Sequence, residues 1–325
     1  MASRTFSKER QEVNKEETNS TSGSRVSDVA GVSETNVDGW PFRKSKYETD
    51  FKSTKASTGS VRIDVDSEVY DMSHDRRGVA LIFNHAHFKS MPSRPGTVKD
   101  CKDLERTLTD HDFEVRIYTD PTIDTITTAL KSTAAEDHTD ADCLVVVAMS
   151  HGESGLLHSY NTLYPVEVLW KFFTADRCPS LAGKPKLVFI QACRGDRLDD
   201  GVTIIHETDG AAIFSIPTYA DIMIAYSTYD GFFSWRNPTA GSWFIQSICN
   251  ELNRNGRTRD LLTMMTFVNR RVGLEYESFV PHKQSMHAKK QIPSVVSMLT
   301  RLVYFHEKIM FRESHGKVED VTEHK

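Results

Sequence analysis

The chain has 325 residues, of which 38% are hydrophobic and 26% are charged, and its formal net charge is −5. This mild acidity gives no reason to expect nucleic acid or an anionic membrane as a partner. The longest uninterrupted apolar run, Cys143–Met149, is far shorter than the roughly 20 residues that cross a bilayer. The first residues also lack the apolar core of a secretory signal, so the sequence predicts a cytoplasmic protein.

The first 60 residues differ in composition from the rest of the chain. Serine and threonine occupy 18 of these positions, and only 14 belong to the hydrophobic set. Such a stretch cannot bury enough apolar surface to offset the entropy that folding removes. We therefore expect residues 1–60 to form a disordered leader, which is too polar for a packed helical adaptor domain.

From about Arg76 onward, short apolar runs rich in β-branched residues alternate with helical patterns. Runs that are apolar on both faces, separated by helices, indicate a mostly parallel sheet with helices on both sides. The sequence thus predicts one α/β domain with a central six-stranded sheet. The strands are expected at Val79–Phe83, Val115–Tyr118, Leu144–Met149, Leu187–Ala192, Ile222–Ser227 and around Leu299–Phe305.

Three helices can be placed by the spacing of their apolar residues and by their N-caps. They are expected at Thr97–His111, from Ser242 to Asn253, and from Asp260 to Glu275. The buried face of the first helix is expected to carry Val98, Cys101, Leu104 and Leu108.

Between Gly195 and Ile216 the alternation stops, and the segment has no clear helix or strand period. It contains the acidic sequence His-Glu-Thr-Asp-Gly at residues 206–210. A structureless loop of this length is uncommon inside a compact domain and is usually functional. The sequence therefore predicts a functional role for this segment.

Two strand ends carry residues capable of nucleophilic and acid–base chemistry. Cys193 follows the run that begins at Leu187, and His151 follows the run that begins at Leu144. In open α/β sheets the ligand crevice lies beyond the carboxyl ends of the strands, so neighbouring strands would bring thiol and imidazole together. An imidazole can activate a thiol and later protonate a leaving amine. The backbone N–H groups of Cys193 and Gly152 are candidates for binding the oxyanion.

The residues alone leave other interpretations open. A single cysteine after an apolar strand is more often a small core residue than a nucleophile, and a lone histidine there is more often a cap or a surface group. His85 and His87 have the residue type of metal ligands, but no further ligand cluster follows at a suitable spacing, so we predict no metal. The other four cysteines are not closely paired, which favours packing roles. They are Cys101, Cys143, Cys178 and Cys249.

Longer motifs decide between these interpretations. Residues 191–195 read Gln-Ala-Cys-Arg-Gly, the caspase signature, and a histidine lies upstream at His151. The chain resembles the executioner caspases, which are clan CD cysteine peptidases, and in particular the insect effector caspases. Further matching segments are SHGE at 150–153, GKPKL at 183–187, SWRN at 234–237, GSWFIQ at 241–246 and HAKKQIP at 287–293.

This resemblance spans about Tyr70 to Phe305 and implies a caspase-like fold and an aspartate-specific cysteine endopeptidase that acts as an executioner of apoptosis. It implies that Cys193 is the nucleophile and that His151 transfers the proton, with Gly152 at the oxyanion. The group that orients the histidine in the family is a backbone carbonyl, which would fall at Pro92.

The family's pocket for the aspartate side chain uses two arginines and a glutamine, which match Arg94, Arg236 and Gln191. Guanidinium groups suit a carboxylate because they bond to it in a planar, two-pronged way. Pro95 follows Arg94 where many relatives have a small polar residue. A proline there biases Arg94 toward extended backbone, which would stiffen the pocket.

Aromatic residues resemble the walls of the family's second and fourth subsites, where bulk and an indole donor shape preference. These are Phe233, Trp235 and Trp243, and Ser234 lies in the same motif. Asn237 resembles the residue that favours an aspartate three places before the cleaved one. The resemblance implies a preference for Asp-Glu-Val-Asp-like sequences, although the aromatic residues by themselves could also belong to the core.

The irregular segment resembles the site where a caspase precursor is divided into two subunits. Cleavage after Asp209 would give a large subunit of residues 61–209 and a small subunit of residues 210–325. Cleavage after Asp38 would release the leader. Competing positions for that cut are Asp28 and Asp66.

The resemblance also implies a homodimer of large and small subunit pairs, without a cofactor. Its expected partners are protein substrates with exposed aspartate-containing loops, an upstream initiator caspase and inhibitor-of-apoptosis-type proteins. Two hypotheses of other classes are an inactive homologue that acts as a decoy and a Cys–His amidotransferase. The first is disfavoured because the catalytic and pocket residues are all present, and the second would have no use for paired arginines.

Overall fold

The computed structural model describes residues 66–196, 198 and 218–308. The expected leader, residues 1–60, and the expected cleavage positions Asp38 and Asp209 lie outside the described residues. Most of the irregular segment between Gly195 and Ile216 also lies outside them. Within the described ranges, no helix has the length and apolarity that crossing a membrane requires.

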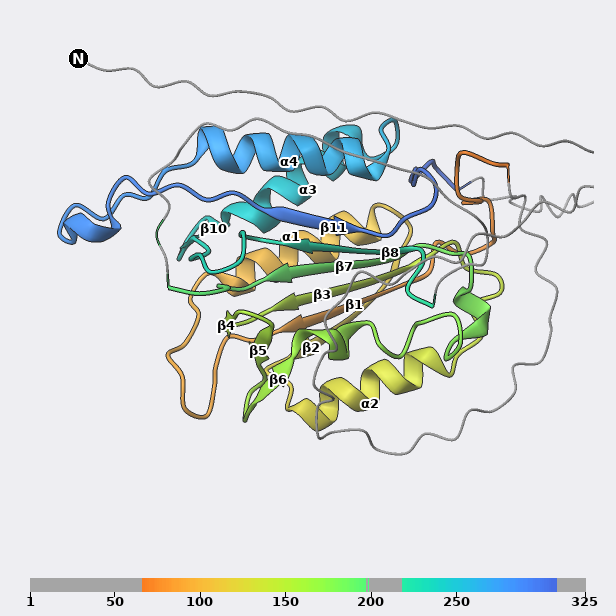
Figure 1. The fold of residues 1–325 in the computed structure, drawn as a ribbon, viewed down its shortest axis with the longest axis horizontal. Coiled ribbons are helices and arrows are strands. Elements are labelled where there is room, and N and C mark those ends of the chain that lie inside the picture. The colour runs from red at the N-terminus through yellow and green to blue at the C-terminus, as the bar shows by residue number, and fades with distance from the viewer. Residues whose placement is uncertain (1–65, 197, 199–217, 309–325) are drawn as a thin grey trace, which may run out of the picture. The chain divides into compact units, whose positions relative to one another are not determined.

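A six-stranded sheet forms the centre of the fold, in the order β11-β8-β7-β3-β1-β2 (Figure 1). Five strands run parallel to one another, and β11 at the edge is antiparallel to β8. The predicted mostly parallel sheet is therefore confirmed. The strands are β1 (Val79–Asn84), β2 (Glu114–Thr119), β3 (Leu144–Met149), β7 (Lys186–Gln191), β8 (Ile222–Tyr226) and β11 (Ser294–Ser297).

The position expected for the sixth strand, around Leu299–Phe305, is wrong, because that strand is β11 at Ser294–Ser297. Val303 and Phe305 are buried in the core instead. The apolar character of their segment therefore reflects side-chain packing and not a place in the sheet. β11 contains two serines and is partly exposed, so hydrophobicity gave only a weak signal for it.

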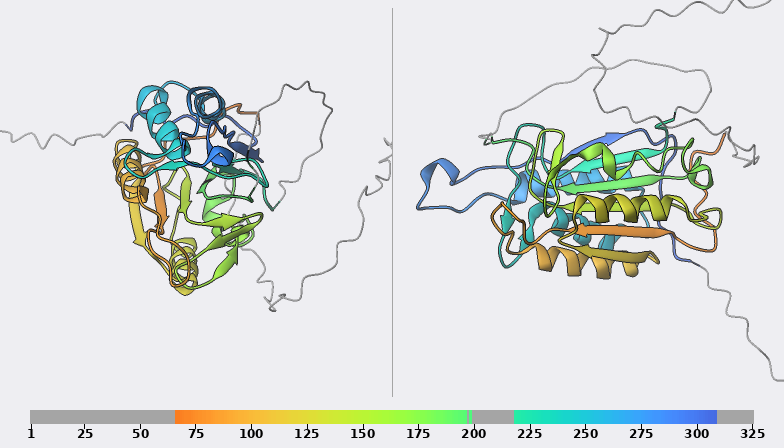
Figure 2. Two further views of the ribbon diagram at one scale, coloured as in Figure 1. Left: turned by 90° about the vertical axis from the view of Figure 1, so that its left-hand side faces the viewer. Right: turned by 90° about the horizontal axis from the view of Figure 1, so that it is seen from below.

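Helices cover both faces of the sheet (Figures 1 and 2). α1 (Thr97–Thr109), α3 (Trp243–Asn255) and α4 (Leu261–Glu275) pack on one face, and α2 (Ile123–Ala134) packs on the other. Along the central strands, alternate side chains enter one core cluster and then the other. This two-sided burial explains why the strands are apolar throughout.

The predicted helix starts are confirmed, although the two caps differ in chemistry. Asp260 accepts a hydrogen bond from the backbone N–H of Thr263 at 3.0 Å, as an N-cap should. Ser242 occupies the N-cap position of α3, but its side chain makes no capping bond. The expected burial of Val98 is wrong, because it is 54% exposed. The buried stripe of α1 instead includes Asp100.

Short elements surround the carboxyl edge of the sheet, where β3 and β7 end. β4 (Gly152–Glu153), β5 (Leu156–His158) and β6 (Leu163–Pro165) form a three-stranded antiparallel sheet. β9 (Arg236–Asn237) and β10 (Gly241–Ser242) form a two-stranded ladder that leads into α3. Three short 3-10 helices complete the described structure: Val166–Leu169, Pro179–Leu181 and Gln284–Met286.

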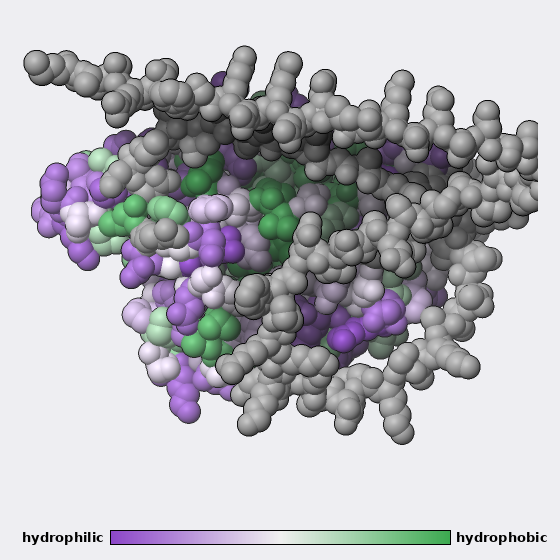
Figure 3. Space-filling model, viewed as in Figure 1, coloured by the Kyte–Doolittle hydropathy of each residue, from purple (hydrophilic) through white to green (hydrophobic). Residues whose placement is uncertain are grey.

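The edge strand β11 leaves apolar residues on the surface. Val296 is 49% exposed and Ile292 is 41% exposed. Figure 3 shows hydrophobic residues gathered on the face over β11. An edge strand of this kind offers backbone groups and apolar side chains to another chain.

Candidate active site

The candidate site begins at the ends of two neighbouring strands. β3 and β7 are parallel and adjacent, with Met149 opposite Gln191. The backbone N–H of Ser150 donates to the carbonyl of Gln191 at 3.0 Å, which extends the pairing past the strand ends. The expectation that the two strands are neighbours is confirmed. As a result, His151 and Cys193 leave the sheet at the same edge.

Cys193 is held by hydrogen bonds on both sides of it along the chain. The hydroxyl of Ser227 donates to the carbonyl of Ala192 at 2.9 Å, and the N–H of Arg194 donates to the carbonyl of Phe232 at 3.0 Å. The thiol is half-buried, and the N–H of Ser234 approaches its sulfur at 3.4 Å. The Cys193 sulfur therefore lies next to the chain segment that precedes β9.

His151 is oriented by one backbone carbonyl. Its Nε2 lies 2.9 Å from the carbonyl oxygen of Pro92. A carbonyl can only accept, so Nε2 carries the hydrogen and Nδ1 is left as an acceptor in the neutral ring. Burial, together with the positive charges of Arg94 and Arg236, lowers the pKa of His151, which favours that neutral ring. The ring of Phe88 lies against the imidazole at a centroid distance of 4.9 Å.

Gly152 lies so close to the backbone of Cys193 that a side chain would not fit. A Cβ atom there would come within 3.0 Å of the carbonyl oxygen of Cys193 and within 2.8 Å of that of Leu156. Glycine therefore lets the backbone of β4 approach Cys193. The backbones of residues 152 and 193 therefore lie next to each other.

Two guanidinium groups lie beside this pair. Arg94 is 2% exposed, and its Nη1 donates to the carbonyl of His85 at 2.8 Å. Its Nε and Nη2 have no hydrogen-bond partner among the residues that the structure describes. Arg236 is half-buried, and its Nε donates to the carbonyl of Pro95 at 2.8 Å. Gln191 donates to the hydroxyl of Ser234 at 2.8 Å, while its side-chain oxygen also has no partner among the described residues.

Burial and nearby charges shift the pKa values of both guanidiniums. Burial and the neighbouring Arg236 lower the pKa of Arg94 to about 9, so Arg94 is still protonated at neutral pH. Burial also lowers the pKa of Arg236. A buried cation with two unpartnered donor atoms, next to a half-buried one, forms a strong electrostatic site for a small anion.

Asp100, which the sequence analysis did not assign to the site, is the buried carboxylate close to these cations. It is 0% exposed, lies in the first turn of α1, and accepts from the N–H of Ser242 at 2.9 Å and from Gln246 at 2.9 Å. Burial raises the pKa of Asp100, while its charge favours the protonated form of both Arg94 and Arg236. Its role depends on contacts 142 residues away, which no local pattern indicates.

A second unassigned residue is Gln291, which is 2% exposed. Its side-chain oxygen accepts from the N–H of Trp235 at 2.6 Å, and its amide donates to the carbonyl of Ser227 at 2.6 Å. It thus links the segment before β9 to the end of β8. In the sequence, Gln291 stands out only by its place in the HAKKQIP motif. That motif supports the family resemblance but does not indicate a role for Gln291.

Two of the three predicted subsite aromatics, Trp235 and Trp243, belong to one aromatic stack. Trp235 and Trp243 have ring centroids 5.9 Å apart, and Trp243 stacks on Tyr276 at 5.2 Å. Trp243 is only 8% exposed and belongs to the core, while Trp235 and Phe233 are half-buried. Trp243 therefore packs against Trp235 from the core and contributes little exposed surface of its own.

Asn237 is exposed, and its side-chain oxygen accepts from the N–H groups of Thr239 at 2.8 Å and Ala240 at 2.9 Å. The carboxamide is thus tied to its own turn, which leaves its NH2 group for other contacts. His85 and His87 have protein partners: His85 contacts the carbonyl of Pro121 and His87 contacts Asp120. The four cysteines assigned to packing are all buried.

An α/β sheet that ends in a cysteine and a histidine, beside two guanidiniums, is the arrangement of a Cys–His hydrolase with an acidic specificity. Comparisons with known proteins agree. The family model described as "Caspase domain" matches residues 77–304. Caspase drICE of Drosophila melanogaster is 48% identical over 269 residues, covering 81% of this chain and 79% of the relative. Caspase-3 of Felis catus is 40% identical over 278 residues, covering 84% of this chain and 99% of the relative.

A solved structure, the crystal structure of Caspase-1 from Spodoptera frugiperda, has a TM-score of 0.71 and 47% sequence identity. The match covers 76% of this chain and 98% of that one. The chain belongs to the caspase family. It is a cysteine endopeptidase that cleaves after aspartate and acts in apoptosis, and it resembles the insect effector caspases. The amidotransferase hypothesis is therefore wrong.

Replacing Gly152 with alanine tests the close approach of β4 to Cys193. The added Cβ has to push the backbone away from the cysteine, and a shift of about 1 Å at a reacting group typically costs about 10²-fold in rate. We expect kcat/KM of G152A to fall by about that factor. The matched control is G155A, because a Cβ at Gly155 meets nothing within 4 Å and costs only backbone strain. Equal losses in the two variants would contradict this explanation.

Replacing Gln291 with alanine leaves a buried N–H and a buried carbonyl without partners. Such a loss typically costs about 1–3 kcal/mol. We expect Q291A to unfold at lower urea concentration and to have a raised KM, because Trp235 is released. The control is Q284A, since Gln284 is exposed. An unchanged KM and unfolding midpoint in Q291A would show that the contacts of Gln291 with Trp235 and Ser227 affect neither substrate binding nor stability.

Proposed function

We propose that Cys193 and His151 carry out the peptide-bond cleavage. His151 Nδ1 takes the proton from the Cys193 sulfur, and the sulfur attacks the carbonyl carbon of the substrate's aspartate. The oxygen becomes an oxyanion, which the N–H groups of Gly152 and Cys193 stabilise. The orientation of the imidazole by the carbonyl of Pro92 supports this assignment, since it leaves Nδ1 for the thiol.

The second half of the reaction returns the enzyme to its starting state. His151 gives its proton to the departing amine as the carbon–nitrogen bond breaks, which leaves a thioester on Cys193. Water then attacks the thioester and gives a proton to His151. The carbon–sulfur bond breaks, the carboxylic acid leaves, and the thiol regains its proton.

Arg94, Arg236 and Gln191 are proposed to bind the side chain of the cleaved aspartate. The observation that carries this proposal is Arg94, a buried guanidinium with two donor atoms that have no partner among the described residues. A short carboxylate can accept from both in the two-pronged geometry that guanidinium favours. Arg236, half-buried nearby, adds a second positive charge.

The remaining subsites are proposed to favour a sequence like Asp-Glu-Val-Asp. The segment from Phe233 to Asn237 lies beside the thiol, and Ser234 contacts the sulfur through its backbone. Phe233 and Trp235 would contact the residue before the aspartate, and the Trp235–Trp243 stack would position that wall. The NH2 group of Asn237, which has no hydrogen-bond partner among the described residues, is suited to an acidic side chain farther upstream.

The wider biology is also proposed from the family. Protein substrates and caspase-type oligomerisation follow from membership, and we propose a homodimer that pairs through the exposed edge strand β11. The zymogen is proposed to be cut after Asp209 by an initiator caspase into residues 61–209 and 210–325, with the leader released after Asp38. A cytoplasmic location and regulation by inhibitor-of-apoptosis-type proteins belong to the same proposal.

Matched peptides that differ only in Asp or Asn at the cleaved position test the pocket assignment. A site built for a polar partner rejects an analogue that lacks it by about 10⁴-fold or more. We expect kcat/KM for the Asn peptide to be lower by about that factor, and the ratio to shrink in R94M and R236M. Comparable kcat/KM values for the two peptides in the wild-type enzyme would refute the assignment.

Asp209→Ala tests the proposed activation cut. We expect the full-length variant to stay a single chain when treated with an active initiator caspase, and its activity on an aspartyl fluorogenic peptide to stay about tenfold or more below that of the wild type. Mass spectrometry of the products identifies the cut. The control is D38A, which should retain the leader but still divide into two subunits. Normal division of D209A would place the cut elsewhere.

A further inference from the structure

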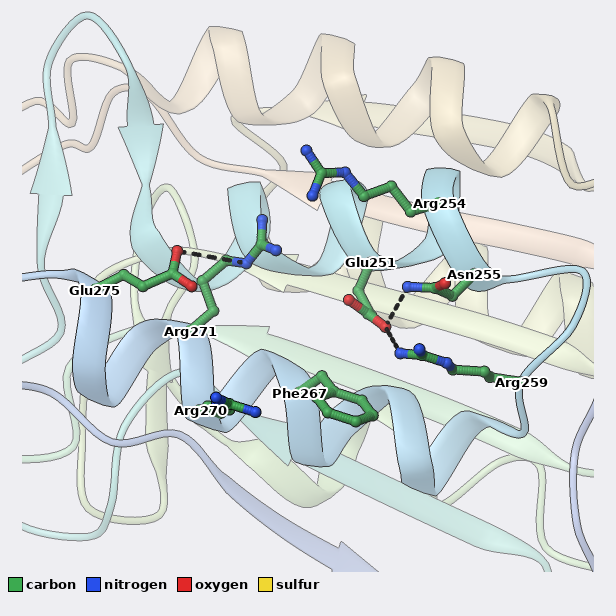
Figure 4. Close-up of a pocket in the computed structure, with 8 residues that line it drawn as sticks. All are labelled: Glu251, Arg254, Asn255, Arg259, Phe267, Arg270, Arg271 and Glu275. Carbon is green, nitrogen blue, oxygen red and sulfur yellow. Dashed lines mark hydrogen bonds and ion pairs between the residues drawn. The ribbon is translucent and has the colours of Figure 1, made fainter.

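A cationic groove lies between α3 and α4, outside the residues proposed for catalysis and substrate binding. It encloses a cavity of about 240 Å³. Figure 4 shows side chains from both helices along it. The lining residues are Glu251, Arg254, Asn255, Arg259, Phe267, Arg270, Arg271 and Glu275.

Four of these residues are arginines and two are glutamates, so the groove has an excess of positive charge. The chain as a whole has a net charge of −5, so this excess does not follow from its composition. Clefts lined by one sign of charge concentrate ions of the opposite sign. The local field therefore favours an anionic ligand.

Part of the groove is rigid. Glu251 is 5% exposed and accepts from Asn255 at 2.7 Å and from Arg259 at 3.1 Å. The guanidinium of Arg259 also lies over the ring of Phe267, 4.6 Å from its centroid. The dashed contacts in Figure 4 join Glu251 to Asn255 at the end of α3 and to Arg259 in the connection that leads to α4. The carboxylate of Glu251 is therefore already paired within the protein, with Asn255 and Arg259.

The other arginines are available to a ligand. Arg254 and Arg270 are exposed and have no hydrogen-bond or ion-pair partner among the described residues. Arg254 extends from α3 and Arg270 from α4, and both line the cavity (Figure 4). Arg271 is half-buried, and its contact with Glu275 is long, with Nε 3.9 Å from the carboxylate. A ligand in this cavity would therefore meet arginine side chains from both helices.

The chemistry of these donors favours phosphate over carboxylate. A single carboxylate has two oxygens and one negative charge. Arg271 already has one carboxylate beside it, that of Glu275. A phosphate group accepts from several guanidiniums at once and is a preferred partner of arginine. The cavity is slightly smaller than the roughly 300–1,000 Å³ of sites for drug-sized ligands, yet it is large for one ion.

We propose that this groove binds a small ligand that carries two linked phosphate groups. Arg254, Arg270 and Arg271 hold the phosphates, and Arg259 with Phe267 forms the fixed wall of the site. The proposal does not depend on the catalytic roles given to Cys193 and His151.

The test is isothermal titration of the full-length protein with inorganic pyrophosphate, in the absence of divalent cations. We expect saturable binding and a rise in the midpoint of thermal unfolding that saturates over the same concentrations. The double variant R254Q/R270Q should bind pyrophosphate at least about tenfold more weakly, since it loses two charge-assisted contacts. Because both side chains are exposed and unpartnered in the described structure, this variant should fold normally.

The control variant K131Q/R177Q removes the same charge from the α2 side of the sheet and should bind like the wild type. ADP and inorganic phosphate serve as further probes. The affinity for ADP should depend on Arg254 and Arg270 as the affinity for pyrophosphate does, and inorganic phosphate should bind more weakly than pyrophosphate. No saturable binding at about 1 mM pyrophosphate overturns the proposal. So does equal affinity in R254Q/R270Q, or an equal loss of affinity in the control, which would mean unspecific attraction by charge.

Discussion

The parallel pairing of β3 with β7 is the constraint on which the site depends. It places Met149 opposite Gln191, so the next residues of both strands leave the sheet at the same edge. A slip of one residue would turn every side chain of a strand to the other face and exchange the two core clusters. The burial of both faces therefore fixes the register, and the register fixes where the histidine and the cysteine emerge.

Beyond that edge, the arrangement is set by charge. Arg94 and Arg236 are taken largely out of water, which is unfavourable for cations unless opposite charge or hydrogen bonds compensate. Asp100 supplies buried negative charge from α1, and it also binds the N–H of Ser242 at the start of α3. Gly241 leaves room for the Asp100 carboxylate, because a Cβ at residue 241 would lie 2.3 Å from one of its oxygens. Asp100 compensates only part of the positive charge of Arg94 and Arg236. An acidic side chain of a substrate would interact with the remainder.

The sequence predicted the parts of this structure that have local signals. Five strands and three helices were placed from apolar spacing, because burial on both faces leaves uninterrupted apolar runs and helix starts carry capping residues. β11 was misplaced, since an exposed edge strand with two serines lacks that signal while the buried segment after it has it. Asp100 and Gln291 were missed because their roles arise from contacts with residues 142 and 56 positions away. Such contacts exist only once the sheet is formed.

The same long-range contacts bear on how a cut after Asp209 would act. The proposed aspartate pocket takes Arg94 and Gln191 from before that position and Arg236 from after it. β7 pairs with β8 across it, and Ser227 binds the backbone on either side of Ala192. Both core clusters also combine residues from the two sides. The two products would therefore remain one folded unit held by the sheet and its cores.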